Sequence, residues 1–195
     1  MKKLLFVASF VMLCLGANAQ QAKGTLTYQP KFGLNIARFT DAEGTTPRFG
    51  LTAGSEFEYQ ITEKFSAAVG VLYSMQGARE SVTTEYDRFD VKYMLDYINI
   101  PIVANVYVYK GLAVKFGVQP GLNISSKYTT SYGNSSYSIS NIRTFDLAIP
   151  VGFSYETKSR IVFDARFNIG VTKVIEDLET RNCVAQLTIG YKFSL

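Results

Sequence analysis

The sequence predicts an all-β fold: an eight-stranded antiparallel up-and-down transmembrane β-barrel, preceded by a cleaved signal peptide. Apolar residues alternate with polar or small ones along much of the chain, which is typical of strands. In segment 97–124 one face is free of charge, and along the chain the connections are in turn short and long. The clearest segment is 97–124, where Ile98 and Ile100 begin an apolar face opposite Asn99 and Asn105.

Segment 97–124 is read as two strands joined by the turn Tyr109-Lys110-Gly111. Each arm reaches the roughly 9–11 residues needed to cross a bilayer at a tilt. The polar face carries Lys115, whereas the apolar face carries no charge. This division suits lipid outside the barrel and a polar lumen inside.

Residues 1–19 read as a secretory signal peptide, with a basic start, an apolar run and a small-residue cleavage pattern at 17–19. A lipoprotein anchored through Cys14 is disfavoured because bulky residues precede it. We expect residues 20–30 to be a periplasmic lead-in and residues 31–195 to be the outer-membrane β-barrel domain.

Composition excludes several classes of function. The 20 basic residues become 18 once Lys2 and Lys3 are removed, against 16 acidic ones, so the net charge of +2 does not favour nucleic acid as a partner. Cys183 would be alone and cannot form an internal disulfide. The absence of histidine removes the commonest general base and metal ligand, and no cofactor is expected.

Alternation and turn residues define the expected strands in order. The first carries Phe32 and Leu34 outward, and the last carries Leu187 and Ile189. Charged or Ser/Asn-rich segments separate the strands, the longest being 77–94 and 125–141. The eight expected strands are 31–39, 49–60, 65–76, 97–108, 112–124, 142–155, 161–172 and 183–193.

The connections after the second, fourth and sixth strands are short, which predicts periplasmic turns, longer outer loops and both termini in the periplasm. Aromatic residues near the strand ends are expected to form interfacial girdles. They are Phe57, Tyr59, Tyr73, Phe153, Tyr155, Tyr191 and Phe193. Pro101, Pro120 and Pro150 lie inside expected strands, where each removes a ladder donor, so bulges or breaks are expected there.

Four short motifs resemble the PorT-like outer-membrane β-barrel family of Bacteroidetes-type bacteria. They are Phe32-Gly33-Leu34-Asn35, Tyr97-Ile98-Asn99-Ile100-Pro101, Phe163-Asp164-Ala165-Arg166-Phe167-Asn168-Ile169-Gly170 and Gly190-Tyr191-Lys192-Phe193. The resemblance implies the outer membrane as location, the barrel-insertion machinery as a partner, and an accessory role in a secretion complex. It also implies that Pro101 is a family feature.

The polar face carries a row of charges that would point into the lumen. They are Glu56, Glu58, Lys115, Asp146, Asp164, Arg166 and Lys192. One reading is an ion path or a lumenal binding site. We favour a structural plug, because an eight-stranded barrel is just wide enough for its side chains to fill. Buried ions must be paired, so Lys115 and Arg166 are expected to contact acids such as Asp164, Asp146 or Glu56.

Catalysis is not expected, because no hydroxyl nucleophile has a histidine to activate it. Segment 125–141 is a candidate surface-binding loop, since Tyr128, Tyr132 and Tyr137 stand among Ser and Asn. Such loops combine large contact area with adaptable hydrogen bonding. The alternative is a solvated connector.

The expected function is therefore a structural or surface-binding role, with the lipid bilayer of the outer membrane and envelope or secretion proteins as partners. The rival hypothesis is a soluble exported lipocalin-like barrel that binds a small apolar ligand and turns its apolar face inward. The polar face is rich in Gly, Ala and Ser, and the chain has no Trp, both of which disfavour this alternative.

Overall fold

The computed structural model describes residues 22–40, 44–83, 88–130, 136–139, 141–175 and 179–195. The expected signal peptide lies outside this range. The described chain forms one sheet of twelve strands. They are β1 (Leu26–Phe39), β2 (Thr45–Thr62), β3 (Phe65–Gln76), β4 (Ala78–Thr83), β5 (Arg88–Asn99), β6 (Ile102–Tyr109), β7 (Leu112–Thr130), β8 (Ser136–Ser138), β9 (Phe145–Glu156), β10 (Ile161–Gly170), β11 (Asn182–Tyr191) and β12 (Phe193–Ser194). No described helix has the length and apolarity needed to cross a membrane.

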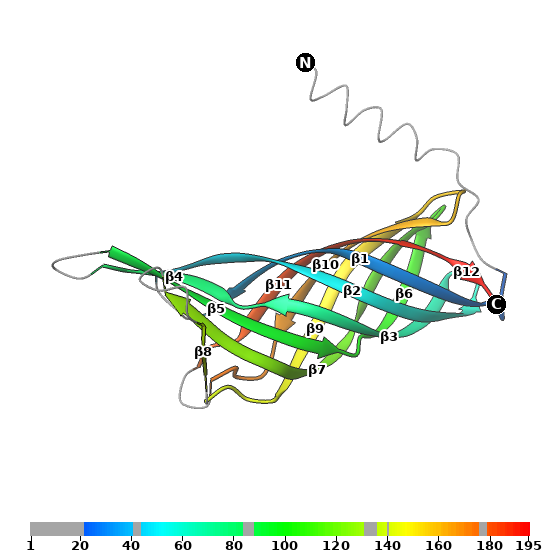
Figure 1. Cartoon of the computed structure of the whole chain (residues 1–195). Helices are drawn as coiled ribbons and strands as arrows, with labels where there is room; N and C mark the ends of the chain where they lie inside the picture. Colours follow the sequence, from blue (N-terminus) through cyan, green and yellow to red (C-terminus); the bar gives the residue numbers. More distant parts are fainter. Residues whose placement is uncertain (1–21, 41–43, 84–87, 131–135, 140, 176–178) are drawn as a thin grey trace, which may run out of the picture.

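The sheet closes on itself as an elongated ring (Figure 1). Its strands follow the order β11-β10-β9-β7-β6-β3-β5-β4-β2-β1, and β1 pairs with β11 through Lys31↔Gly190 to complete the ring. All the pairings are antiparallel, as predicted. Closure leaves no unpaired edge in the wall, which a membrane-spanning sheet requires.

The strand number differs from the eight predicted, because short irregular stretches of backbone interrupt some of the strands. β5 and β6 both pair with β3 and with β7, and Ile100-Pro101 separates them. β3 and β4 both pair with β2, and between them Gly77 has a φ of 121°, a conformation that favours glycine. β12 follows Lys192 and pairs with β1.

Strands also extend into segments that were predicted to be irregular. β1 begins at Leu26, inside the expected lead-in 20–30. β4 and β5 occupy much of the expected loop 77–94, and β7 and β8 much of 125–141. In β7 and β8, backbone pairing sustains the extension without an alternating apolar face, so the pattern in the sequence did not reveal it. In β1, Leu26 and Tyr28 alternate with the buried Thr27 and Gln29, so the sequence could have revealed this extension.

Of the three prolines, only Pro101 interrupts a strand. β7 is continuous through Pro120 and β9 through Pro150, so the expected distortion at these two residues is wrong. Each loses a single donor, while the backbone oxygen of Pro120 still accepts from the amide of Ile100 at 2.8 Å. The flanking pairs preserve the register.

Side chains alternate between a buried inner face and an exposed outer face. Large apolar residues such as Phe32 and Phe49 are 67% and 66% exposed, whereas Asn35 and Lys115 are buried. The apolar face is therefore outside, and the lipocalin-like alternative is wrong. Lipid is the solvent that such an outer face requires.

The two ends of the barrel differ. One end, called here the turn end, carries the short connections 63–64, 110–111 and 157–160, the start of β1 and the C-terminus (Figure 1). The opposite loop end carries the longer connections and the projecting parts of β4, β5, β7 and β8. Most of the expected girdle residues lie near the turn end, where Tyr28, Phe57, Tyr191 and Phe193 form ring contacts.

Candidate functional site: the barrel lumen

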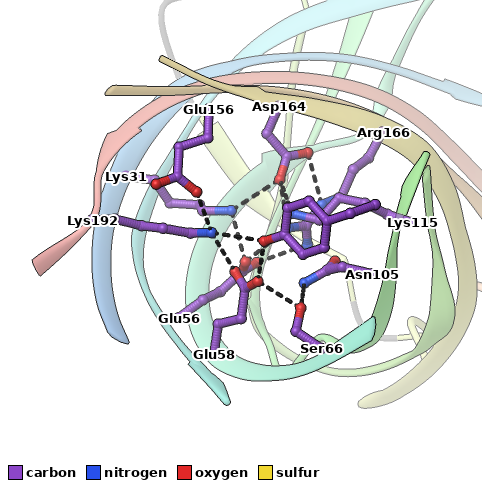
Figure 2. Close-up of polar contacts among 11 residues, drawn as sticks. Lys31, Glu56, Glu58, Ser66, Asn105, Lys115, Glu156, Asp164, Arg166 and Lys192 are labelled. Carbon is purple, nitrogen blue, oxygen red and sulfur yellow. Dashed lines mark hydrogen bonds and ion pairs between the residues drawn. The ribbon is translucent and has the colours of Figure 1, made fainter. Parts of the chain in front are cut away.

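Six of the seven predicted lumenal charges lie near the turn end in two adjacent buried groups, which are together called here the lumen network (Figure 2). They come from strands all around the ring, so the network connects opposite sides of the wall. The seventh, Asp146, lies apart from the network. It accepts a hydrogen bond from the Thr172 hydroxyl at 2.5 Å.

The first half of the network surrounds Asp164 on β10. Its carboxylate contacts Lys31 at 3.2 Å, Lys115 at 2.6 Å and Arg166 at 2.7 Å. Glu56 on β2 contacts Lys31 at 2.8 Å and accepts a hydrogen bond from Arg166 Nη2 at 2.8 Å. Arg166 Nη1 lies 2.7 Å from the other carboxylate oxygen as an ion pair without hydrogen-bond geometry.

The second half surrounds Lys192, between β11 and β12. Its ammonium contacts Glu58 and Glu156, each at 2.9 Å, and the Tyr107 hydroxyl at 3.0 Å. Glu58 also accepts hydrogen bonds from Tyr107 at 2.5 Å and from Ser66 at 2.6 Å. Glu58 is therefore supported by two hydroxyl hydrogen bonds as well as by an ion of opposite sign.

The network contains four cations and four carboxylates, so its formal charge is zero. Burial of an ion costs several kcal/mol, roughly, unless a partner and further hydrogen bonds compensate. The equal numbers of cations and carboxylates give each buried ion a partner of opposite charge, and no further ion is needed. Its members are Lys31, Lys115, Arg166 and Lys192 with Glu56, Glu58, Glu156 and Asp164.

Sequence reasoning missed Lys31 and Glu156. Lys31 has the same parity along its strand as Gly33 and Asn35, which were assigned to the inner face, so the alternation could have identified it. Glu156 was assigned to a turn, but it is the last residue of β9 and has the inward parity of Ser154.

Glycines make room for the long charged side chains. Gly152 stands between Lys115 and Arg166 in the same row of the sheet. A Cβ atom at Gly70 would lie 2.5 Å from the Glu56 Cγ and from the Ser55 carbonyl oxygen. Small residues beside large ones let the narrow interior be filled without clashes.

Above the charges, the middle of the lumen holds amides and hydroxyls. Asn35 donates to Ser74 at 2.9 Å, and Gln186 donates to Asn35 at 3.2 Å and to Thr52 at 3.1 Å. These side chains come from β1, β2, β3 and β11, so the middle layer also spans the lumen.

An apolar cluster lies inside the wall toward the loop end. Leu95 and Tyr97 of β5 are fully buried there with Val174, which lies in the connection between β10 and β11. The Tyr97 hydroxyl accepts a hydrogen bond from Asn182 at 3.3 Å. This group, called here the mouth cluster, consists of Phe39, Ala78, Leu95, Tyr97 and Val174.

The predicted tyrosine loop is largely strand. Tyr128 of β7 and Tyr137 of β8 stack with their ring centroids 5.4 Å apart. Tyr137 is exposed, and Tyr132 lies outside the described residues. The structure therefore brings two of the three candidate tyrosines together on a short hairpin.

The outer wall carries a concavity of about 800 Å³, lined by outward residues such as Phe32, Phe153 and Leu187.

In the described part of the chain, no three His, Cys, Asp or Glu side chains are placed to hold a metal. The exposed Glu179 pairs with Lys173 at 2.5 Å, and this hydrogen bond lowers the pKa of the Glu179 carboxyl.

A closed antiparallel ring with an apolar outside and a charged, filled inside defines the class of membrane-spanning β-barrels. The model of the outer membrane protein beta-barrel domain family matches residues 18–176, and the chain belongs to this family. It is therefore an outer-membrane β-barrel protein, as predicted. No curated protein matches the sequence.

The chain also resembles solved structures at low sequence identity. Neisserial surface protein A is 13% identical, with a TM-score of 0.56 over 86% of this chain and 97% of that one. The attachment invasion locus protein Ail of Yersinia pestis is 15% identical, with a TM-score of 0.46 over 88% and 99%. OprG of Pseudomonas aeruginosa is 14% identical, with a TM-score of 0.42 over 90% and 99%.

Proposed function

We propose that the protein is a non-conducting, non-enzymatic barrel that crosses the outer membrane eight times and presents a binding surface at its loop end. The charge-balanced lumen network carries this proposal. Its cations and carboxylates are already paired with each other, so a passing ion would have to displace partners that are costly to leave alone.

Eight crossings follow from treating β3–β4, β5–β6 and β11–β12 as interrupted single crossings and from leaving out the three-residue β8, which pairs with β7 outside the ring. Each second member continues along a strand that the first already borders. The short turns, the start of β1 and the C-terminus lie at one end of the ring (Figure 1). In bacterial barrels this end faces the periplasm, which places the loop end outside the cell.

The binding surface is the part of β4, β5, β7 and β8 that projects beyond the wall (Figure 1). Pairing along Arg79↔Lys92, Tyr93↔Tyr128 and Tyr128↔Tyr137 makes it a continuous sheet. Rigid elements position contacts better than loose loops do. The PorT-like resemblance supports an envelope or secretion protein as the partner, with an accessory role for the barrel.

The lumen is tested in planar lipid bilayers with the purified, refolded protein. We expect no steady conductance, because charged, amide and apolar layers follow one another along the lumen. A large and stable conductance from the unaltered protein would overturn the proposed sealed lumen.

The surface is tested by shortening both projecting hairpins. Two-residue Asn-Gly turns replacing 81–90 and 128–137 preserve the pairs Glu80↔Val91 and Lys127↔Ser138 beneath them. We expect the shortened barrel to shift on unboiled gels as the full one does, but to fail to restore the envelope phenotype of a deletion strain. Full complementation would assign the function to the wall or to the periplasmic turns.

A further inference from the structure

The outer wall changes from apolar to cationic at the loop end. On β7 the exposed Ile124 is followed by exposed Lys127, and on β1 outward Ile36 is followed by outward Arg38. Arg143 likewise precedes the exposed Phe145 of β9. The apolar band is therefore bordered by basic side chains on several neighbouring parts of the ring.

The opposite border is aromatic. Tyr59, Tyr109 and Phe193, exposed by 50%, 53% and 47%, mark the turn end of the same outer face. Aromatic residues suit either interface of a bilayer. The turn end also carries exposed Lys64, Lys110 and Lys158, but these lie in separate connections and not opposite one another on paired strands.

The densest part of the cationic border lies where β4, β5 and β7 are adjacent (Figure 1). Arg79 and Lys92 are directly opposite each other on β4 and β5. Lys127 is the diagonal neighbour of Lys92, because Met94 pairs with Lys127 and Lys92 with Thr129. Directly opposed like charges destabilise a sheet. A bound anion would relieve the repulsion between these cations.

Described acidic neighbours on this face already have other contacts. Asp90 accepts a hydrogen bond from Ser81 at 2.6 Å, and Asp96 accepts one from the Tyr73 hydroxyl. Within the described ranges, no ion pair joins Arg79, Lys92 or Lys127 to a carboxylate. The surface therefore has more positive than negative charge just beyond the apolar band.

We propose that Arg79, Lys92 and Lys127 form a binding site for the phosphate of a phosphate-bearing lipid in the outer leaflet. Arginine grips phosphate with two parallel hydrogen bonds, and lysine adds a point charge. Lys127 is three residues beyond Ile124, or about 10 Å along the strand. The lipid's chains would lie on the apolar column that ends at Ile124. The choice of leaflet rests on the proposed orientation.

The test measures binding of phosphatidic acid to the full-length protein in neutral maltoside micelles, by native mass spectrometry and by the shift of the unfolding temperature. The triple variant Arg79→Gln/Lys92→Gln/Lys127→Gln should bind at least about tenfold more weakly, since each lost charge-assisted bond contributes to affinity. A matched control, Lys64→Gln/Lys110→Gln/Lys158→Gln, removes the same charge from exposed turn-end residues and should bind like the unaltered protein.

Lys92→Gln alone provides a second readout. It should raise the unfolding temperature without lipid, because the opposed like charges are relieved, and reduce the further rise that phosphatidic acid produces. Equal loss of binding in both triple variants would overturn the site in favour of net charge. If millimolar inorganic phosphate displaced phosphatidic acid, the site would be one for any phosphate anion, and the lipid would be overturned as its ligand. These outcomes do not depend on the hairpins above Glu80 and Lys127, so they are separate from the test of the binding surface.

Discussion

Asp164 shows how much one lumenal side chain depends on its neighbours. Three cations from β1, β7 and β10 contact this carboxylate, and its exposure to solvent is negligible. Removing one partner of such a group leaves an uncompensated buried charge, which costs more than the pair itself contributes. The exposed pair Lys173–Glu179 has no such dependence, because water can replace either partner.

Asp164→Asn is therefore expected to lower the free energy of unfolding by about 3–5 kcal/mol. Urea unfolding of the barrel in lipid vesicles, followed by the gel mobility of unboiled samples, measures this loss. Glu179→Gln is the control and should leave the urea midpoint almost unchanged. Similar midpoints for the two variants would mean that the lumen network is solvated and unimportant for stability.

At the scale of the element, paired strands place their outward residues side by side in the membrane. Ile102 of β6 and Val118 of β7 are directly opposite each other, and both are about half exposed. Val108 is on the same outward face of β6 but lies beside the turn at 110–111. The cost of a charge on this face depends on its depth in the bilayer.

Replacing Ile102 or Val118 with Arg should cost roughly 2–4 kcal/mol, the value expected near the midplane. Val108→Arg should cost about 0–1 kcal/mol, because the side chain can reach the interface. Reversible unfolding from vesicles of defined thickness compares the three variants. If Val108→Arg were as costly as the other two, the membrane boundary would lie beyond the turn end.

The proposed sealed lumen would contain two unlike seals in series. The charged network would close it near the turn end, and the mouth cluster would close it toward the loop end. The first depends on paired ions from distant strands, whereas the second depends on apolar side chains from β5 and from the connection that carries Val174. Either seal alone should stop ions.

Truncating one seal should therefore leave the bilayer current near zero, and truncating both should open a path. Leu95→Ala/Tyr97→Ala removes the bulk of the mouth cluster, and Lys115→Ala/Arg166→Ala removes bulk and charge from the network. Single-channel recording of the two double variants and of the quadruple variant makes the comparison. Conductance in the mouth variant alone would show that the charged layer is permeable.

Alternation by itself determined which face of each strand meets lipid, because a period of two leaves no freedom once one face is apolar. It placed Ile102 and Val118 outward and Lys115 and Arg166 inward, and Pro101 correctly marked an interruption. The class of protein, the outer-membrane barrel, follows from these faces and from the alternation of short and long connections.

Only the tertiary structure decided which charges meet. Lys31 contacts Asp164 across 133 residues of sequence because β1 and β10 both border β11. Tertiary pairing also turned much of 77–94 and 125–141 into strands, since a backbone next to a neighbouring strand forms hydrogen bonds whatever its side chains. Parity along a strand is a local property, whereas register and closure depend on the whole ring.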